Sequence, residues 1–250
     1  MLSGESQVSN VGRLIMDLEK LYSQWVERVC TFLEDTGPTL GPGGRHCATF
    51  QSKPILDGSD HIVILGYNPH EDWGFDGVDV NRFYTGNPSF YTPERLTWKV
   101  WRRFYNAMKY VSFTRPLEDG NFVFFNAVYF GSKDVADLKR INGINSAIDM
   151  CLDFTSELIH GILCPKAIVC LSVNECFNLI DNKFCFRQKE IFRPSHIYCG
   201  EKIISTRSVV RGLWNDIPVY GIPHPSGRIS NDDWGAIATF LKGELSPIYQ

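Results

Sequence analysis

The sequence predicts one three-layer α/β/α domain, in which helices cover both faces of a central parallel sheet of four strands. Two observations predict this class. Four short apolar runs lack the alternation of half-exposed strands, as parallel strands buried on both faces do, and amphipathic helical segments lie between them. The chain has 250 residues, of which 44% are hydrophobic and 21% charged. This length and composition predict a single globular domain over residues 1–250.

The predicted elements follow in order along the chain. Apolar residues recur at helical spacing from Val11 to Leu33, behind a capping Ser9 or Asn10, and the Gly/Pro-rich segment 36–44 is expected to be a loop. The expected strands are residues 61–65, 122–125, 167–171 and 218–222, and the main expected helices are residues 92–110 and 145–163. The stretch 196–210 is expected to add a hairpin or irregular strands.

Composition narrows the class of protein. No apolar run approaches the ~20 residues of a membrane-spanning helix, and the N-terminus lacks the basic start and apolar core of a signal peptide. The eight cysteines form no Cys-x-x-Cys pair, so we expect reduced thiols in an intracellular, cytoplasmic protein with no bound metal. We also expect no cofactor and a monomeric state.

Charge is unevenly distributed. The net charge is −3, which argues against a strongly basic nucleic-acid binder. Residues 1–80 hold five basic and twelve acidic residues, whereas residues 181–228 hold eight basic and four acidic residues. The basic C-terminal stretch allows a local phosphate-binding face, although a solvated surface gives the same pattern.

The polar residues that follow the predicted strands are the candidate site. Open parallel sheets bind ligands outside the carboxyl ends of their strands. The residues found there are Gly66-Tyr67-Asn68-Pro69-His70 after the first strand, Asn126 after the second, Ser172 and Asn174 after the third, and His224-Pro225-Ser226-Gly227-Arg228 after the fourth. Asn68, Asn126 and His224 carry the most useful chemistry of these loops.

Strong nucleophile motifs are missing from these loops. The sequence has neither a Gly-x-Ser-x-Gly elbow nor a Gly-rich phosphate loop. One of four acidic residues near the first loop is a candidate general base: Glu71, Asp72, Asp76 or Asp79. The pattern favours a site that recognises a neutral polar ligand and stabilises a developing anion through hydrogen bonds.

Three of these segments together resemble the uracil-DNA glycosylase superfamily over residues 58–240. Gly66-Tyr67-Asn68-Pro69 is similar to the Gly-x-Asn-Pro motif of the mismatch-specific and single-strand-selective branches. His224-Pro225-Ser226-Gly227-Arg228 resembles the superfamily's second motif, and the segment Tyr84 to Pro88 before Trp98-Lys99 is similar to an aromatic segment of the mismatch-specific branch. The helix within residues 1–35 lies outside the resemblance.

The resemblance implies a uracil-DNA glycosylase-like fold and gives roles to the central residues. Asn68 would position the attacking water, Asn126 would read the edge of uracil, and His224 would donate to O2 of the base, where charge develops. Tyr84, or its neighbour Phe83, would stack on the flipped base. Gly66 and Tyr67 would line the base pocket.

It also implies contacts to DNA. Ser226 and the backbone of Gly227 would grip a phosphate, Pro225 belongs to the same DNA-binding loop, and Arg228 would fill the gap that the base leaves. His70 departs from the Asn branches, which carry Gly there, and a bulky His70 is expected to favour uracil over thymine. In isolation, each motif has a structural explanation: a turn, a capping amide or a surface loop.

The function expected from the sequence is hydrolysis of the N-glycosidic bond of uracil, or a related deaminated base, in DNA. The alternative is a protein on the same fold that binds a nucleobase, a nucleotide or modified nucleic acid without cleaving it, which the acidic net charge keeps open. A serine hydrolase using Ser226 with His224 is a poor third hypothesis, because residues two apart in such a loop rarely meet as nucleophile and base.

Overall fold

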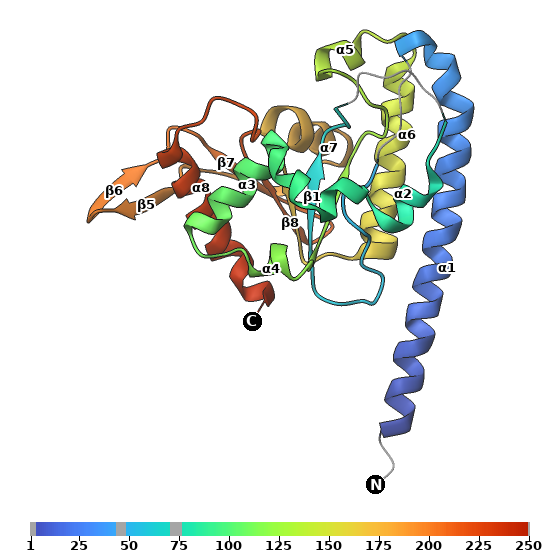
Figure 1. Cartoon of the computed structure of the whole chain (residues 1–250), viewed down its shortest axis with the longest axis horizontal. Helices are drawn as coiled ribbons and strands as arrows, with labels where there is room; N and C mark the ends of the chain where they lie inside the picture. Colours follow the sequence, from blue (N-terminus) through green and yellow to red (C-terminus); the bar gives the residue numbers. More distant parts are fainter. Residues whose placement is uncertain (1–3, 44–48, 71–76, 250) are drawn as a thin grey trace.

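A sheet of six strands forms the middle layer of the protein (Figure 1). The computed structural model describes residues 4–43, 49–70 and 77–249. Four parallel strands lie in the order β2-β1-β3-β8: β2 (Phe122–Asn126), β1 (Ile62–Gly66), β3 (Ala167–Cys170) and β8 (Ile217–Gly221). The α/β class, with a mostly parallel sheet between helices, is therefore confirmed.

Two further strands correct the predicted four-stranded sheet. β7 (Val209–Trp214) pairs antiparallel with β8, and β4 (Arg187–Phe192) pairs antiparallel with β7 at the edge. β4 is almost wholly exposed, so it lacks the apolar run that marks a buried strand. The expected hairpin is present as β5 (Ser195–Tyr198) and β6 (Glu201–Ile204), which form a separate two-stranded sheet.

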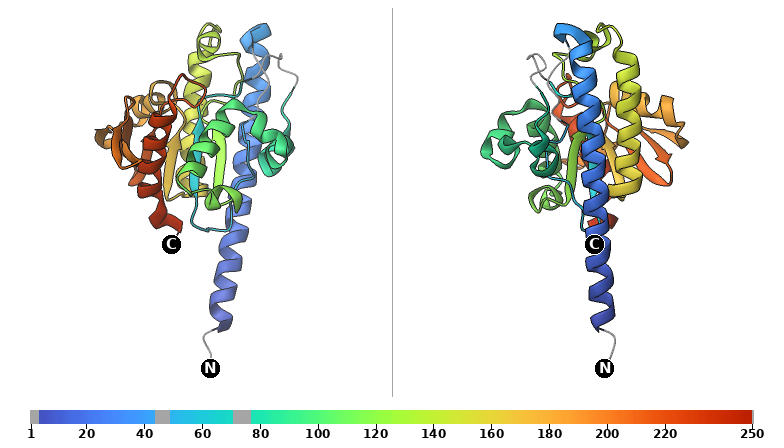
Figure 2. Two further views of the ribbon diagram at one scale, coloured as in Figure 1. Left: turned by 60° about the vertical axis from the view of Figure 1, so that its left-hand side comes forward. Right: turned by 90° about the vertical axis from the view of Figure 1, so that its right-hand side faces the viewer.

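The side chains of the sheet alternate between two apolar layers. Val63, Leu65 and Ile168 face one layer, while Ile62 and Ile64 face the other. The first layer lies under α1 (Gly4–Thr36), α6 (Ile144–Glu157) and α7 (Asn178–Phe184), and the second lies under α3 (Lys99–Tyr110) and α8 (Asn231–Leu245). The two views of Figure 2 show these helices on opposite sides of the sheet.

Shorter helices connect these layers, and several boundaries differ from the predicted ones. Pro93 opens a 3₁₀ turn, so the helix predicted from residue 92 begins only at Lys99. The remaining short helices are α2 (Val80–Thr85), α4 (Arg115–Glu118) and α5 (Val135–Lys139), the 3₁₀ turns η1 (Gly37–Gly43), η2 (Pro88–Tyr91), η3 (Pro93–Thr97) and η6 (Ser246–Tyr249), and the π-helical turns η4 (Leu158–Leu163) and η5 (Val173–Phe177).

Helix α1 is part of the domain core, although it lies outside the residues that carry the resemblance. Trp25 is fully buried, and its indole N–H donates to the Phe154 carbonyl in α6 at 3.0 Å. The first half of α1 extends past the rest of the chain in both figures. Among the described residues, no helix combines the length and the apolar character needed to cross a membrane.

We expect Trp25→Ala to destabilise the protein by about 3–5 kcal/mol, because it removes a buried aromatic side chain and leaves a cavity. Urea unfolding followed by circular dichroism measures the change. Met16→Ala is the control on the same helix, since Met16 is 64% exposed and its removal is expected to change stability by less than about 0.5 kcal/mol. Equal effects of the two substitutions would show that α1 is not part of the core.

Candidate functional site at the carboxyl ends of the parallel strands

Backbone hydrogen bonds continue past the strands and hold two of the predicted loops together. The Ala127 N–H donates to the Gly66 carbonyl at 2.9 Å, and the Val128 N–H donates to the Tyr67 carbonyl at 2.8 Å. The loops that follow β1 and β2 therefore run side by side. This pairing brings the predicted residues Gly66, Asn68 and Asn126 to one place.

Gly66 and Asn126 are matched by sterics. They lie directly opposite each other in the β1–β2 register. A Cβ atom at Gly66 would come within 2.3 Å of Asn126 Oδ1, so a larger residue at 66 would displace this amide. Asn126 is 5% exposed, and its backbone N–H donates to the Thr49 carbonyl at 3.0 Å. The glycine thus makes room for one buried, well-placed amide.

The Asn68 side chain is held in a single orientation. Its Nδ2 group donates to Ser132 Oγ at 2.7 Å, to the Pro69 carbonyl at 3.1 Å and to the Phe130 carbonyl at 3.3 Å. Two of these partners are carbonyls and accept only, which fixes the amide flip. Within the described part of the chain, Asn68 Oδ1 has no protein donor, so it remains an acceptor.

Ser132 is a supporting residue that the sequence analysis missed. Its hydroxyl donates to the Asp134 carbonyl at 2.6 Å and so presents a lone pair to Asn68. A signal was present, because Ser132 follows Asn126 by six residues in the same strand-end segment.

Tyr67 and His70 occupy different environments. Tyr67 is 7% exposed, and burial raises its pKa to about 12, with further increases from Cys176 and Glu175. Its ring belongs to the apolar core, and its place in the base pocket stays a prediction. His70 is exposed and forms a parallel bridge with Ser132, so its role as a gate stays a prediction.

Phe83 and Tyr84 both contact helix α1, and the burial of Phe83 removes it from the predicted stacking on a base, whereas stacking by the partly exposed Tyr84 stays a prediction. Phe83 is 1% exposed, and its ring centroid lies 6.0 Å from that of Trp25. The Tyr84 hydroxyl lies 3.3 Å from Ser23 Oγ, and its ring packs edge-on against Tyr22. Both rings therefore help to fix α1 to α2.

The His224 loop is internally bonded. The Ser226 N–H donates to His224 Nδ1 at 3.2 Å, and Ser226 Oγ lies 2.7 Å from the same nitrogen. The Gly227 N–H donates to the His224 carbonyl at 2.9 Å. These groups are engaged within the loop in this structure, and the predicted phosphate contact of Ser226 and the Gly227 backbone stays a prediction. Contrary to expectation, Ser226 and His224 do meet.

Two arginines from other elements hold this loop in place. Arg103 of α3 donates to the Pro225 carbonyl at 3.1 Å and also to the Gly227 carbonyl. Arg207 donates to the Arg228 carbonyl at 3.1 Å. The Arg228 side chain is exposed beside them. The loop therefore combines a fixed backbone with a basic surface.

The surroundings of His224 favour the neutral form of its imidazole. Desolvation by the surrounding groups lowers its pKa, Glu175 acts in the opposite direction, and Lys99 lowers it further. Because the Ser226 N–H donates to Nδ1, the neutral ring carries its proton on Nε2. His224 thus presents an N–H donor while remaining accessible to solvent.

Glu175 is an acidic residue of this edge that the sequence analysis missed. It lies in η5, where the Cys176 thiol is 3.5 Å from the Gly66 carbonyl, and Phe177 packs so closely on Gly221 that a Cβ there would lie at 2.9 Å. The turn η5 therefore spans the ends of β1 and β8. Its charge raises the pKa of both Tyr67 and His224.

Ser172 caps η5 and positions this glutamate. Ser172 Oγ accepts from the Glu175 N–H at 3.1 Å, and the Ser172 hydroxyl donates to the Glu175 carboxylate. The sequence signal was Ser172 followed three residues later by Glu175, ahead of a helical segment. The sequence analysis named Ser172 and Asn174 instead.

Only one of the four acidic candidates for a general base lies among the described residues. Glu71, Asp72 and Asp76 lie outside the described residues. Asp79 caps α2 by accepting from the Asn81 N–H at 3.1 Å, and it also pairs with Arg82. Capping of α2 and pairing with Arg82 therefore account for the position of the Asp79 carboxylate.

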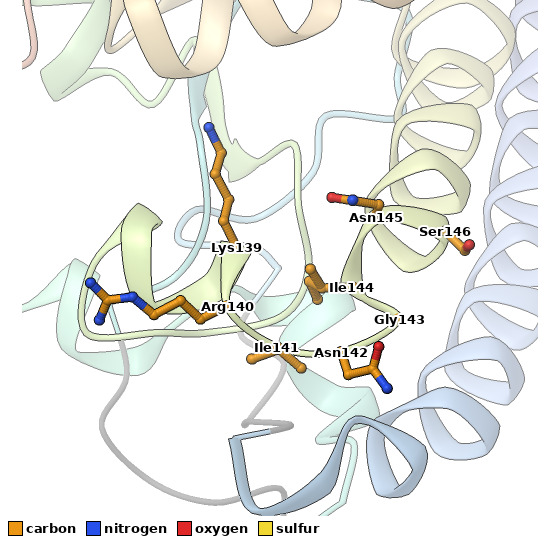
Figure 3. A pocket seen from close by; sticks show the side chains of 8 residues that line it. All are labelled: Lys139, Arg140, Ile141, Asn142, Gly143, Ile144, Asn145 and Ser146. Atoms are coloured by element: carbon orange, nitrogen blue, oxygen red, sulfur yellow. The ribbon is translucent and has the colours of Figure 1, made fainter.

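A surface depression of about 500 Å³ lies elsewhere, between α5 and the start of α6 (Figure 3). It is lined by Lys139 to Ser146 and contains none of the predicted site residues. It is wide open to solvent, so the candidate site is placed by its chemistry and not by the size of this depression.

No family model matches this chain, and no curated protein is similar to it. The site is therefore defined by its own geometry: two oriented amides, a neutral imidazole and a carboxylate around the carboxyl ends of β1, β2, β3 and β8.

We expect Asn68→Asp to lower stability by about 1–3 kcal/mol at pH 7, because a carboxylate cannot donate to the Pro69 and Phe130 carbonyls. Urea unfolding measures the loss. Asn142→Asp, at an exposed position, introduces the same charge and is the matched control. Equal stability of the two variants would refute the assigned amide orientation.

Proposed function

We propose that this protein is a monofunctional DNA glycosylase that hydrolyses the N-glycosidic bond of uracil, or of a related deaminated base, flipped out of DNA. The proposal includes a uracil-DNA glycosylase-like arrangement of the α/β/α fold. One observation carries it: Asn68 is oriented as an acceptor on the same edge of the sheet where Asn126 is held by Gly66. An oriented acceptor such as Asn68 suits the positioning of an attacking water. A buried amide such as Asn126 suits the recognition of a base.

Asn68 would position the water. Its Oδ1 atom accepts a hydrogen bond from a water on the sugar side, while Ser132 and two carbonyls keep the amide from turning. An amide orients water without removing its proton effectively, so we expect slow catalysis. This role demands rigidity of the side chain, which the three donated hydrogen bonds provide.

Asn126 would read the base. A buried amide offers one acceptor and a donor, which match N3–H and O4 of uracil. Its position over Gly66 limits where a flipped base can lie. Phe83 and Tyr84 are packed against α1, so the proposed recognition depends on hydrogen bonds more than on stacking by those two rings.

His224 would stabilise the leaving base. Bond cleavage leaves negative charge on the base, and a fixed donor aimed at that charge is worth roughly 3–4 kcal/mol in a transition state. The neutral imidazole supplies such a donor at Nε2, because Ser226 occupies Nδ1. Arg103 keeps the loop fixed, and the exposed Arg228 would enter the space that the base leaves.

The contact between Ser226 and His224 favours a serine hydrolase only superficially. The Ser226 Oγ–His224 Nδ1 distance of 2.7 Å is suitable for proton transfer. However, the N–H groups of Ser226 and Gly227, which would have to stabilise an oxyanion, both donate to His224 instead. The loop geometry therefore supports an oriented histidine better than an activated serine.

We expect the protein to create alkali-labile sites in labelled DNA that contains one uracil, tested as single strands and as U:G and U:A pairs. Asn68→Ala and His224→Ala are each expected to lower the rate by about 10²-fold or more, because each removes a group that acts in the transition state. The rate is measured from strand breaks after alkali treatment under single-turnover conditions.

Asn142→Ala is the control, since Asn142 is exposed and lines the depression that contains none of the predicted site residues. Rates on T:G pairs test the His70 gate, which predicts slower excision of thymine. No breaks on any of these substrates, nor on DNA with hypoxanthine, would contradict catalysis and leave a base-binding protein as the better reading.

We expect Glu175→Gln to move the acidic limb of the kcat/KM profile to lower pH. The carboxylate raises the pKa of His224, so removing its charge lowers that pKa and keeps the imidazole neutral in more acidic solution. Glutamine leaves the Glu175 N–H bond to Ser172 unchanged, and its side-chain carbonyl can still accept from the Ser172 hydroxyl. Asp60→Asn, at the amino end of the sheet, is the control. An unchanged acidic limb of the profile in Glu175→Gln would show that Glu175 does not raise the pKa of His224.

A further inference from the structure

The β5–β6 hairpin is a stiff arm that the candidate site does not use (Figure 1). Its turn is Cys199-Gly200, with φ of 50° and 84°, as in a tight two-residue hairpin turn that matches the strand twist. Tyr198 and Glu201 pair directly across this turn. Each strand has four residues, so the arm is about 13 Å long.

One face of the arm is fixed to helix α8. His196 is 6% exposed and lies so close to Gly235 that a Cβ there would be 2.8 Å from its ring. Buried Asp233 accepts from Ser205 Oγ at 2.9 Å and from the Thr206 N–H at 2.6 Å. These contacts set the direction of the arm, so its other face points consistently to solvent.

The outer face is apolar and basic. Ile197 and Ile204 are 67% and 59% exposed, and Lys202 is paired with Ile197 across the strands. Residues 193–207 hold three basic residues and one acidic residue, in a chain whose net charge is −3. Within the described residues, neither Arg193 nor Lys202 has an ion-pair partner.

The base of the arm lies beside the His224 loop. Arg207, three residues after β6, donates to the Arg228 carbonyl at 3.1 Å. The outer face and the loop thus belong to one surface region. A macromolecule bound at His224 would have to pass close to the arm.

We propose that the β5–β6 arm is a contact for double-stranded DNA next to the His224 loop. This inference rests on the proposed function and deepens it, since it assigns duplex DNA as the substrate form. A two-stranded ribbon fits the width of a duplex groove, basic side chains neutralise phosphates, and exposed isoleucines contact sugars and thymine methyl groups.

Charge selects DNA over a second copy of this chain as the partner. A symmetric pairing of two arms would bring two surfaces of net charge +2 together around Lys202. The phosphate backbone carries the complementary charge. Exposed apolar residues alone would suit either partner, but the basic residues favour the DNA backbone over a second arm.

The test is binding of the full chain to an unmodified duplex of about 20 base pairs and to one of its strands, measured by fluorescence anisotropy from low to moderate salt. We expect Arg193→Ala/Lys202→Ala to weaken duplex binding on the order of tenfold. We also expect the slope of log Kd against log salt to fall by about 2, with a smaller effect on the single strand.

Lys20→Ala/Lys166→Ala removes the same charge from α1 and from the amino end of β3, and is the matched control. Ile197→Ser adds a variant that tests the apolar contact without changing charge. Melting temperatures verify that these exposed substitutions leave the fold intact.

The outcomes separate the two proposals, because the probe contains no uracil. Loss of duplex binding in the arm variants, with the control unchanged, supports the arm even if the protein excises no base. Equal affinities and salt slopes in the arm and control variants overturn it even if excision is fast. A change of oligomeric state in Ile197→Ser, measured by light scattering, would also overturn it, in favour of contact between copies.

Discussion

The contact between Gly66 and Asn126 is the constraint on which the candidate site depends. The β1–β2 register places the two residues opposite each other, and only a residue without a side chain leaves space for the amide. The same pairing continues through Ala127 and Val128, which carries the Asn68 loop alongside Ser132. One strand register therefore determines the positions of both amides. The His224 loop depends on a separate restraint, the Arg103 guanidinium that holds two of its carbonyls.

The sequence predicted the parallel core because fully buried strands need continuous apolar runs, and these four strands have them. It did not predict β4 as a sheet strand, because its residues Arg187–Phe192 are exposed at an edge and stabilised mainly by backbone pairing with β7. A predicted helix start was wrong where a local residue favours another conformation, as at Pro93, which opens a 3₁₀ turn. Burial leaves a clear sequence pattern, whereas backbone pairing at an exposed edge leaves almost none.

The positions of the predicted site residues could be read from the sequence only in part. Residues directly after a strand lie at the expected sheet edge, because the end of a strand fixes their position there. The burial of Phe83 was not predicted, because an aromatic side chain in a core and one in a binding platform look alike in sequence. The supports of the site, Arg103 and Ser132, act across loops through hydrogen bonds that a single sequence does not reveal. Glu175 was readable from its spacing to the capping Ser172.

The docking of helix α1 also affects how the chain is made. Trp25 bonds to Phe154, which lies 129 residues later, so the helix leaves the ribosome long before its partner exists. At synthesis rates of about 5–20 residues per second, this interval is roughly 6–26 s. During that time the aromatic face of the helix can contact only its earlier partners, such as Phe50 and Phe83, and lacks the surface of α6. Nascent chains of this protein therefore expose the part of this face that α6 later covers until the middle of the chain has emerged, and such exposed apolar surface is a target for chaperones.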